Sequence, residues 1–379
     1  MTRKPARGAS GSWMCRLFTM VSILITTGLL SGAATATEKE VVGIEFEERA
    51  AINRMRVAML AFLDGLTPEL RDKAMFDFRD EERQRWSNVP YTMYEREGVS
   101  IGEMTADQQV LAHRLLQSAL TDQGYLKTTG IMHLDEILAA MARARGRNDS
   151  PFGLDYYWIG VFGDPANDGV WGWQLDGHHL ALNFTVVGDH ASVTPAFMGT
   201  DPAEIRDGPH AGWRILSEED DVGRALFESL DEAQKKKALL SSDGLRDIIA
   251  GAGNRDRITA IEGLPARDMN TEQQTLLSLL ILTYLDNMRP GLIVGEKSQL
   301  PIEGLHFAWM GAEAGKPYYY RIHGPNIWIE FDNSYAPGRK SGPINHIHSI
   351  WRHPANDYGL DLLREHYETS PHHQEPGDE

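Results

Sequence analysis

The sequence predicts an α+β fold made of two pseudo-symmetric repeats, each with helices followed by an antiparallel β-hairpin and a third strand. Two observations support this fold class. Helical segments are followed in both halves by runs in which apolar and polar residues alternate. Four segments of the first half also match four of the second half in the same order, which indicates a diverged internal duplication. The matched pairs are 62–76 with 226–240, 104–109 with 269–274, 157–160 with 308–311, and 174–184 with 321–331.

Helices are predicted where apolar residues recur with the helical period behind a capping residue. Thr105 with Gln108, and Asn270 with Gln273, have the spacing of a capping box, in which each side chain bonds to the backbone of the other residue. The predicted helices are 53–62, 68–86 and 105–120 in the first repeat, 218–240 and 270–287 in the second, and a closing helix at 358–367.

Strands are predicted where apolar and polar residues alternate. The hairpin arms are close in the chain and antiparallel, which is typical of an α+β protein. No linker rich in Pro, Gly or Ser separates the repeats, so we expect the two halves to pack against each other. The predicted strands are 156–162, 171–187 and 191–197 in the first repeat, and 305–310, 318–331 and 344–351 in the second.

The first residues have the composition of an export signal. Basic residues precede an apolar core at 17–30, and Ala34-Thr35-Ala36 has the form of a cleavage site. The apolar run is short for a membrane span, so we expect cleavage, no stable membrane insertion afterwards, and a periplasmic or extracellular location. The predicted organisation is a signal peptide at 1–36, a first repeat at 37–212, a second repeat with the C-terminal helix at 213–369, and a disordered tail at 370–379.

The chain is acidic, with a formal net charge of −17. Removal of the signal takes away four positive charges and leaves a mature charge of about −21. Such a surface disfavours nucleic acid and anionic lipid as partners. The single cysteine, Cys15, lies within the signal, so the predicted mature chain has no disulfide and no thiolate. A metal site would therefore need His, Asp, Glu or Asn as ligands.

The strongest candidate for a metal site is the pair His346 and His348 in the predicted strand 344–351. Side chains two apart in a strand point to the same side, which lets one strand present two imidazoles to one ion. The glutamate that follows such a pair in cupins is absent, because the next acid is Asp357. The alternative interpretation is that both histidines are hydrogen-bonding groups that line a polar cleft.

The adjacent pair His178 and His179 opens the second arm of the first hairpin. Neighbouring strand residues point to opposite faces, so the pair by itself cannot bind one ion without a bulge. We expect His179 and Asn183 to share the polar face and His178 to be a structural residue on the apolar face. In the second repeat the same alternation places a polar face opposite Ile329 and Phe331, and its members are Asn326, Trp328, Glu330 and Asp332.

Four motifs in the chain resemble a known family: Leu175 to Phe184, Thr194 to Gly199, Arg321 to Pro325 with Ile329 to Asn333, and His346 to Arg352 with Asp357-Tyr358-Gly359. The sequence resembles the bacterial and fungal proteins grouped as domain of unknown function 3500, over nearly the whole predicted mature chain. The resemblance implies no particular reaction. It implies that six polar residues lie in the signature segments of the family: His178, His179, Glu330, His346, His348 and Arg352.

The leading hypothesis is an exported metal-dependent enzyme, with a hydrolase favoured because hydrolases are common among exported proteins. We expect His179, His346 and His348 to bind a divalent metal in the cleft between the repeats, with zinc as the first choice and copper or iron as alternatives. Glu330 would be a fourth ligand or the general base, and Arg352 would hold an anionic group. The residues expected to contact a small-molecule, sugar or peptide substrate are His178, Asn183, Trp328 and Trp351.

Two other functions fit the same residues. One is a copper- or iron-dependent oxidoreductase that uses the same histidines as ligands. The other is a metal-free binding protein whose histidines line a polar groove for a sugar or peptide. The sequence assigns no oligomeric state. It lacks the G-x-S-x-G and H-E-x-x-H motifs of common serine hydrolases and zinc proteases.

Overall fold

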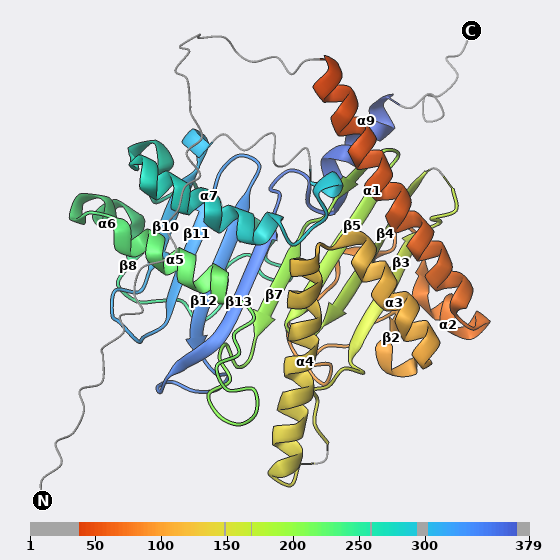
Figure 1. Ribbon diagram of the computed structural model, residues 1–379, viewed down its shortest axis with the longest axis horizontal. Helices are drawn as coiled ribbons and strands as arrows, with labels where there is room; N and C mark the ends of the chain where they lie inside the picture. The colour runs from red at the N-terminus through yellow and green to blue at the C-terminus, as the bar shows by residue number, and fades with distance from the viewer. Residues whose placement is uncertain (1–37, 148, 168, 258–259, 294–301, 370–379) are drawn as a thin grey trace, which may run out of the picture.

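A computed structural model describes residues 38–147, 149–167, 169–257, 260–293 and 302–369. The protein is a mixed α/β structure in which helices cover a large mixed sheet (Figure 1). The helices are α1 (Glu38–Gly65), α2 (Pro68–Ala74), α3 (Ala106–Ala119), α4 (Asp122–Ala144), α5 (Ser217–Ser229), α6 (Glu232–Ala238), α7 (Thr271–Leu285) and α9 (Leu360–Thr369). The strands are β1 (Met75–Phe76), β2 (Val99–Ser100), β3 (Tyr157–Gly163), β4 (Val170–Gly177), β5 (Leu180–Val187), β6 (His190–Ser192), β7 (Ala196–Thr200), β8 (Leu239–Ser241), β9 (Leu264–Pro265), β10 (His306–Met310), β11 (Tyr318–His323), β12 (Trp328–Tyr335) and β13 (Ile344–Arg352).

A single continuous sheet runs through both halves of the chain. Its main strand order is β1-β3-β4-β5-β7-β13-β12-β11-β10-β8, so β7 and β13 form the central pair that joins the halves. The central pair and the flanking meanders are antiparallel. At the two outer ends, β1 pairs with β3 and β8 pairs with β10 in parallel. This arrangement brings the end of the β4–β5 hairpin next to β13.

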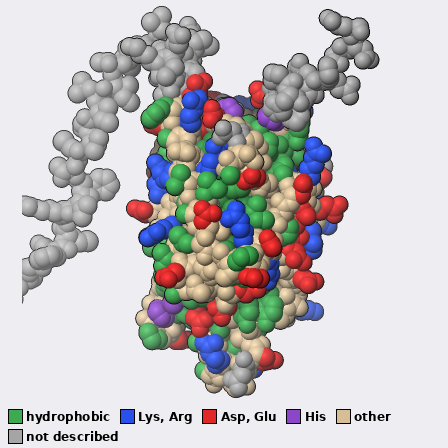
Figure 2. Space-filling view, turned by 90° about the vertical axis from the view of Figure 1, so that its right-hand side faces the viewer, with side chains coloured by type: hydrophobic (Ala, Val, Ile, Leu, Met, Phe, Trp, Pro, Cys, Tyr) green, Lys and Arg blue, Asp and Glu red, His purple; other side chains and the backbone are tan. Residues whose placement is uncertain are grey.

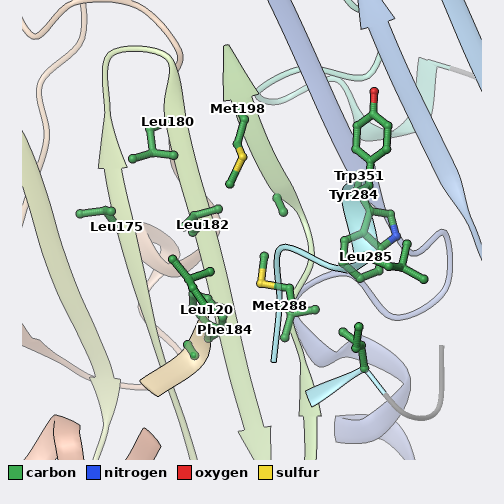
Figure 3. Close-up of a cluster of buried hydrophobic side chains, with 14 of the residues drawn as sticks. Leu120, Leu175, Leu180, Leu182, Phe184, Met198, Tyr284, Leu285, Met288 and Trp351 are labelled. Atoms are coloured by element: carbon green, nitrogen blue, oxygen red, sulfur yellow. The ribbon is translucent and has the colours of Figure 1, made fainter. Parts of the chain in front are cut away.

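On one face of the sheet, α1, α3 and α4 lie over the first half and α5, α6 and α7 lie over the second (Figure 1). Apolar strand residues on this face form a core that continues across the central pair, as Figure 3 shows for Phe184, Met198 and Trp351. The ends of the helices also meet there, since the Thr121 amide donates to the Asn287 carbonyl at 3.1 Å. The two halves therefore share one core.

Two irregular segments, 77–98 and 242–257, cover the opposite face of the sheet. Trp86 and Ile248, one from each segment, pack with Ala181, Phe197 and Ile350 in a smaller apolar cluster. These three strand residues stand side by side on β5, β7 and β13. Polar side chains further along the same strands thus lie beneath the two segments, and the candidate site is among them.

Several predicted elements are confirmed, and two of the predicted helices end early or are divided. The capping boxes at Thr105 and Asn270 begin α3 and α7. The predicted helix 68–86 ends at Ala74, because Met75 and Phe76 pair with β3. The predicted helix 218–240 is divided into α5 and α6, since a new capping box begins at Asp231. β1 follows α2 and β8 follows α6, and these two short strands pair at the outer ends of the sheet.

Helix α4 is absent from the sequence-based prediction. Its sequence contains Gly124 and Gly130, which lower the helical propensity of the segment. Packing explains both residues. A Cβ on Gly124 would come within 2.0 Å of the Asn287 carbonyl oxygen, and a Cβ on Gly130 would lie 3.0 Å from Ile215. The close approach of α4 to the second half therefore outweighs its low propensity.

The predicted signal peptide at 1–36, including Cys15, and the predicted tail at 370–379 lie outside the described residues. Among the described helices, none combines the length and the apolar character required to span a bilayer. On the side of the molecule formed by α1, α2 and α3, acidic and basic side chains are interspersed with apolar ones (Figure 2). This face carries no large patch of a single charge sign.

Candidate metal centre

Three histidines meet where β13 passes the tip of the β4–β5 hairpin. Gly177 pairs with Leu180, so His178 and His179 form the two-residue turn of the hairpin and do not lie within a strand as predicted. His179 has a φ of 61°, a left-handed conformation that is uncommon for a residue other than glycine. Backbone outliers of this kind cluster at functional sites.

Cross-strand pairing sets the position of each ring. Gly199 on β7 pairs with His348 on β13, and the Gly199 amide donates to the His179 carbonyl at 2.8 Å. A Cβ on Gly199 would lie 3.0 Å from Cδ2 of His179 and 3.2 Å from Cδ2 of His348. The absence of a side chain at Gly199 therefore provides the space in which the two imidazoles approach each other.

The three side chains are close enough to share one ion. His179, His346 and His348 are buried, and one ligand atom from each lies within 4.8 Å of the others. Nε2 of His179 is 2.9 Å from Nε2 of His346. Two nitrogens bound to a tetrahedral zinc ion would be roughly 3.3 Å apart, which is close to this separation. The prediction that His346 and His348 project together, toward His179, is confirmed.

His348 has polar partners at both ring nitrogens. Its Nδ1 lies 2.8 Å from Oδ1 of Asp247 and 3.7 Å from Oδ1 of Asp332, which is the cross-strand neighbour of His348 on β12. Its Nε2 lies 3.3 Å from the side-chain amide nitrogen of Asn88. A carboxylate on one imidazole nitrogen commonly orients the other toward a metal, and Asp247 has this position.

Electrostatics keep two of the imidazoles neutral. Burial, together with the neighbouring histidines, holds the pKa of His179 and the pKa of His346 well below the usual range. Burial also opposes the charged form of His348, but its hydrogen bond to Asp247 and the charge of Asp332 outweigh burial and raise its pKa. Burial raises the pKa of Asp332 to about 7. Neutral imidazoles are the form that binds a metal.

His178 lies next to the cluster but has a separate partner. Its Nδ1 is 2.7 Å from Oδ1 of Asp135 on α4, and the Tyr157 hydroxyl donates to the other oxygen of Asp135 at 3.1 Å. The His178 and His179 ring centroids are 3.9 Å apart. His178 is therefore a buried histidine with a carboxylate partner beside the three-histidine cluster.

The structure places Glu330 away from the cluster, on β12 beneath the segment 242–257. Its carboxylate is fully buried, and it is not among the described residues whose ligand atoms converge. It accepts hydrogen bonds from four donors: the amides of Ile249 and Ala250, the Tyr319 hydroxyl and the Trp328 indole. Its oxygens thus anchor the covering segment to the sheet.

Arg352 likewise holds the covering segment. Its guanidinium donates to the carbonyls of Ala250 and Gly251 and lies 2.6 Å from Oδ2 of Asp357. Only 2% of the residue is exposed, and its charge is paired within the protein. These contacts point the guanidinium at the covering segment and Asp357, not at the three histidines. The geometry therefore gives no support to the expected role of Arg352 in holding an anion.

The residues expected to contact substrate are dispersed. Asn183 donates to the Pro195 carbonyl at 2.8 Å. Trp328 is buried against His323, with ring centroids 5.2 Å apart. Trp351 points to the helix-covered face of β13, away from His346 and His348, and packs near Tyr284 (Figure 3). Of the four, His178 alone contacts a ring of the cluster.

A family model described as a protein of unknown function (DUF3500) matches residues 48–360. The chain belongs to this family. No curated protein and no solved structure matches the chain. The range that matches DUF3500 contains both the three histidines and the carboxylates beside them.

Three carboxylates of the site were not selected from the sequence: Asp135, Asp247 and Asp332. Asp332 had a usable signal, because the strand alternation placed it on the polar face of β12 with Glu330. Asp135 and Asp247 had none, since each reaches a histidine from a distant segment. Asn88 likewise comes from the segment 77–98, whose path the hydrophobic pattern does not determine.

Proposed function

We propose that this protein is an exported, metal-dependent hydrolase whose metal ion is held by His179, His346 and His348. The observation that carries the proposal is the convergence of three buried imidazoles from two distant segments, with ligand atoms within 4.8 Å of one another. Three neutral imidazoles form a ligand set of known zinc enzymes, in which a fourth position remains open for water. Zinc is the first choice of ion, and copper or iron are alternatives for the same nitrogens.

The surroundings of the cluster support a ligand role. The conformation of His179 is unfavourable for a side chain with a Cβ, and Gly199 leaves room only for rings that approach each other. Without an ion, the Nε2 atoms of the three buried imidazoles have few partners among the described residues. The Nε2 atoms of His179 and His346 contact each other, and Nε2 of His348 contacts the side-chain amide of Asn88. A metal would satisfy all three nitrogens together.

His179, His346 and His348 would hold a divalent ion, which would supply the Lewis acidity that makes water a nucleophile at neutral pH in metal-dependent hydrolases. We assign proton transfer to His178, because Asp135 engages its Nδ1 and so leaves Nε2 as the nitrogen that exchanges a proton. Glu330 is not assigned to this role, since four donors already engage its carboxylate. The substrate class is a small molecule, sugar or peptide that carries a hydrolysable bond.

The experiment that tests the metal site is elemental analysis of the purified protein after dialysis against zinc. Wild type is expected to retain zinc, whereas His346→Ala and His179→Ala lose the ion of this site. His190→Ala is the matched control, because His190 is an exposed histidine that pairs with Glu48. A panel of ester, phosphoester, glycoside and peptide substrates then tests hydrolysis. Wild type that takes up no ion would overturn the proposal.

We also propose that the two halves are diverged copies of one unit. The parallel pair of β1 with β3, flanked by β2, has a counterpart in β8 with β10, flanked by β9. The capping-box residues Gln108 and Gln273 donate to the carbonyls of Gly65 and Ser229, the last residues of α1 and α5. Superposition of residues 62–200 on 226–352 in a crystal structure tests the duplication, which fails if no single rotation aligns the four matched segments.

A further inference from the structure

A second group of potential ligands lies on the other side of His348. Asp247, Asp332 and His348 each offer an atom within 4.8 Å of the others. The histidine atom in this group is Nδ1, at 2.8 Å from Asp247 and 3.7 Å from Asp332. The Nε2 atom of the same ring remains for the three-histidine cluster. One imidazole thus separates two sets of potential ligands.

Asp332 is the observation that points to a cation. The residue is fully buried, and neither carboxylate oxygen has a hydrogen-bond partner in the described part of the chain. Burial is the larger effect on the pKa of Asp332 and raises it, although the Ser334 hydroxyl, which donates to the Arg246 carbonyl at 3.4 Å, also lies near enough to lower it. A buried carboxylate without a hydrogen bond is costly, and proteins compensate it with a paired charge or a coordinated ion. Among the described residues, His348, with its Nδ1 atom 3.7 Å away, is the one side chain that forms an ion pair with Asp332.

The geometry fits an ion with nitrogen and oxygen ligands. Metal–ligand distances of 2.0–2.2 Å place neighbouring ligand atoms roughly 2.8–3.6 Å apart, close to the two separations at Nδ1 of His348. An ion from solvent can reach the site at Asp247, because 62% of the Asp247 side chain is exposed, whereas Asp332 is fully buried. An ion can therefore reach the buried carboxylate by exchange at Asp247.

We propose that a second divalent cation binds between Asp247, Asp332 and Nδ1 of His348, and that His348 bridges this ion and the ion of the three-histidine site. The two ions would lie roughly 6 Å apart across the imidazole ring. Binding of the second ion displaces the proton of Nδ1, which passes to solvent, so the ring becomes an imidazolate when both sites are filled. The second site uses its own carboxylates; only the bridge rests on the proposed function.

Metal stoichiometry tests the second site. Full-length protein dialysed against zinc and then against buffer is expected to retain two ions per chain. Asp247→Asn and Asp332→Asn are each expected to retain one, because the three-histidine site remains. Asp243→Asn is the control, since it changes an exposed carboxylate of the same segment. Asp247→Asn alters an exposed side chain, so its loss of one ion cannot be attributed to misfolding.

Copper loading tests the bridge. Two copper(II) ions joined by one imidazolate are magnetically coupled, so the electron paramagnetic resonance signal is expected to be well below that of two isolated ions. Zinc in one site or Asp332→Asn restores the signal of one isolated copper ion. Two fully uncoupled copper signals in wild type would overturn the bridge.

The outcomes separate the two proposals. One ion in wild type that is lost in His346→Ala and kept in both aspartate variants overturns the second site and leaves the proposed function intact. One ion that is lost in the aspartate variants and kept in His346→Ala overturns the three-histidine site and supports the carboxylate site. No bound ion in wild type overturns both.

Discussion

Nε2 of His179 lies 2.9 Å from Nε2 of His346, although 167 positions separate the two residues in the chain. The pairing of β7 with β13 brings them together, because Gly199 on β7 bonds to the hairpin turn and stands beside His348. The junction of the two halves is thus also the place where the imidazoles converge.

Gly199→Ala is expected to weaken metal binding about 10- to 100-fold while the protein remains folded. The added methyl would lie 2.8 Å from the Ile347 carbonyl oxygen and 3.0 Å from the His179 ring, so the imidazoles must separate. Competition with a chromophoric zinc chelator measures the affinity. Gly169→Ala is the control, because a Cβ there meets no atom within 4 Å. Equal affinities of the two variants would refute the packing argument.

Glu330→Gln is expected to lower the free energy of unfolding by about 2–4 kcal/mol without changing the metal content. The amide nitrogen of glutamine would face donors that now bond to the carboxylate, including the Ile249 and Ala250 amides. Urea unfolding and elemental analysis check the two halves of the prediction. The control is Glu228→Gln, since this glutamate is exposed near the end of α5. Loss of the ion from stably folded Glu330→Gln would show that Glu330 is a ligand after all.

Asp332→Asn is expected to change how the stability of metal-free protein depends on pH. Burial raises the pKa of Asp332 to about 7, above its ordinary value near 4, so the folded state holds a proton that the unfolded state releases. The stabilisation from that proton is complete below about pH 4 and is lost as the pH rises through 7. Wild type should therefore lose about 2–3 kcal/mol relative to the variant between pH 5 and 7. Urea titrations in the presence of a chelator measure both curves, and parallel curves would contradict the assignment.

Lys127→Met is expected to destabilise the protein by about 3–5 kcal/mol. Nζ of Lys127 on α4 lies 2.7 Å from Oε1 of Glu219 on α5, so this buried pair connects the first half to the second. Removal of the lysine leaves a buried carboxylate whose other oxygen already has no partner. The double variant Lys127→Met with Glu219→Leu should recover most of the loss in urea unfolding. Arg143→Met is the exposed control, with an expected change below about 1 kcal/mol.

Several parts of the site could be predicted from local sequence because they depend on local geometry. Strand alternation alone places His346 and His348 on one side of β13, and the structure confirms it. The same rule fails for His178 and His179, because these residues form the hairpin turn, where alternation does not apply. The role expected of Glu330 was also inferred from strand alternation, which places its side chain on the polar face of β12. Strand alternation gives no information about the segment 242–257, whose amides engage the Glu330 carboxylate.

The sequence by itself determined the capped helices α3 and α7, the two hairpins, and the common side of His346 and His348, since these depend on residues a few positions apart. Tertiary structure alone decided that β7 pairs with β13, that Asp135 and Asp247 reach histidines, and that Asp332 is buried with no hydrogen bond to its carboxylate within the described residues. These relationships arise from contacts between distant segments, whose free energies depend on which surfaces are buried together. Helix α4 shows the same effect, because its glycines disfavour a helix locally and permit close packing against the second half.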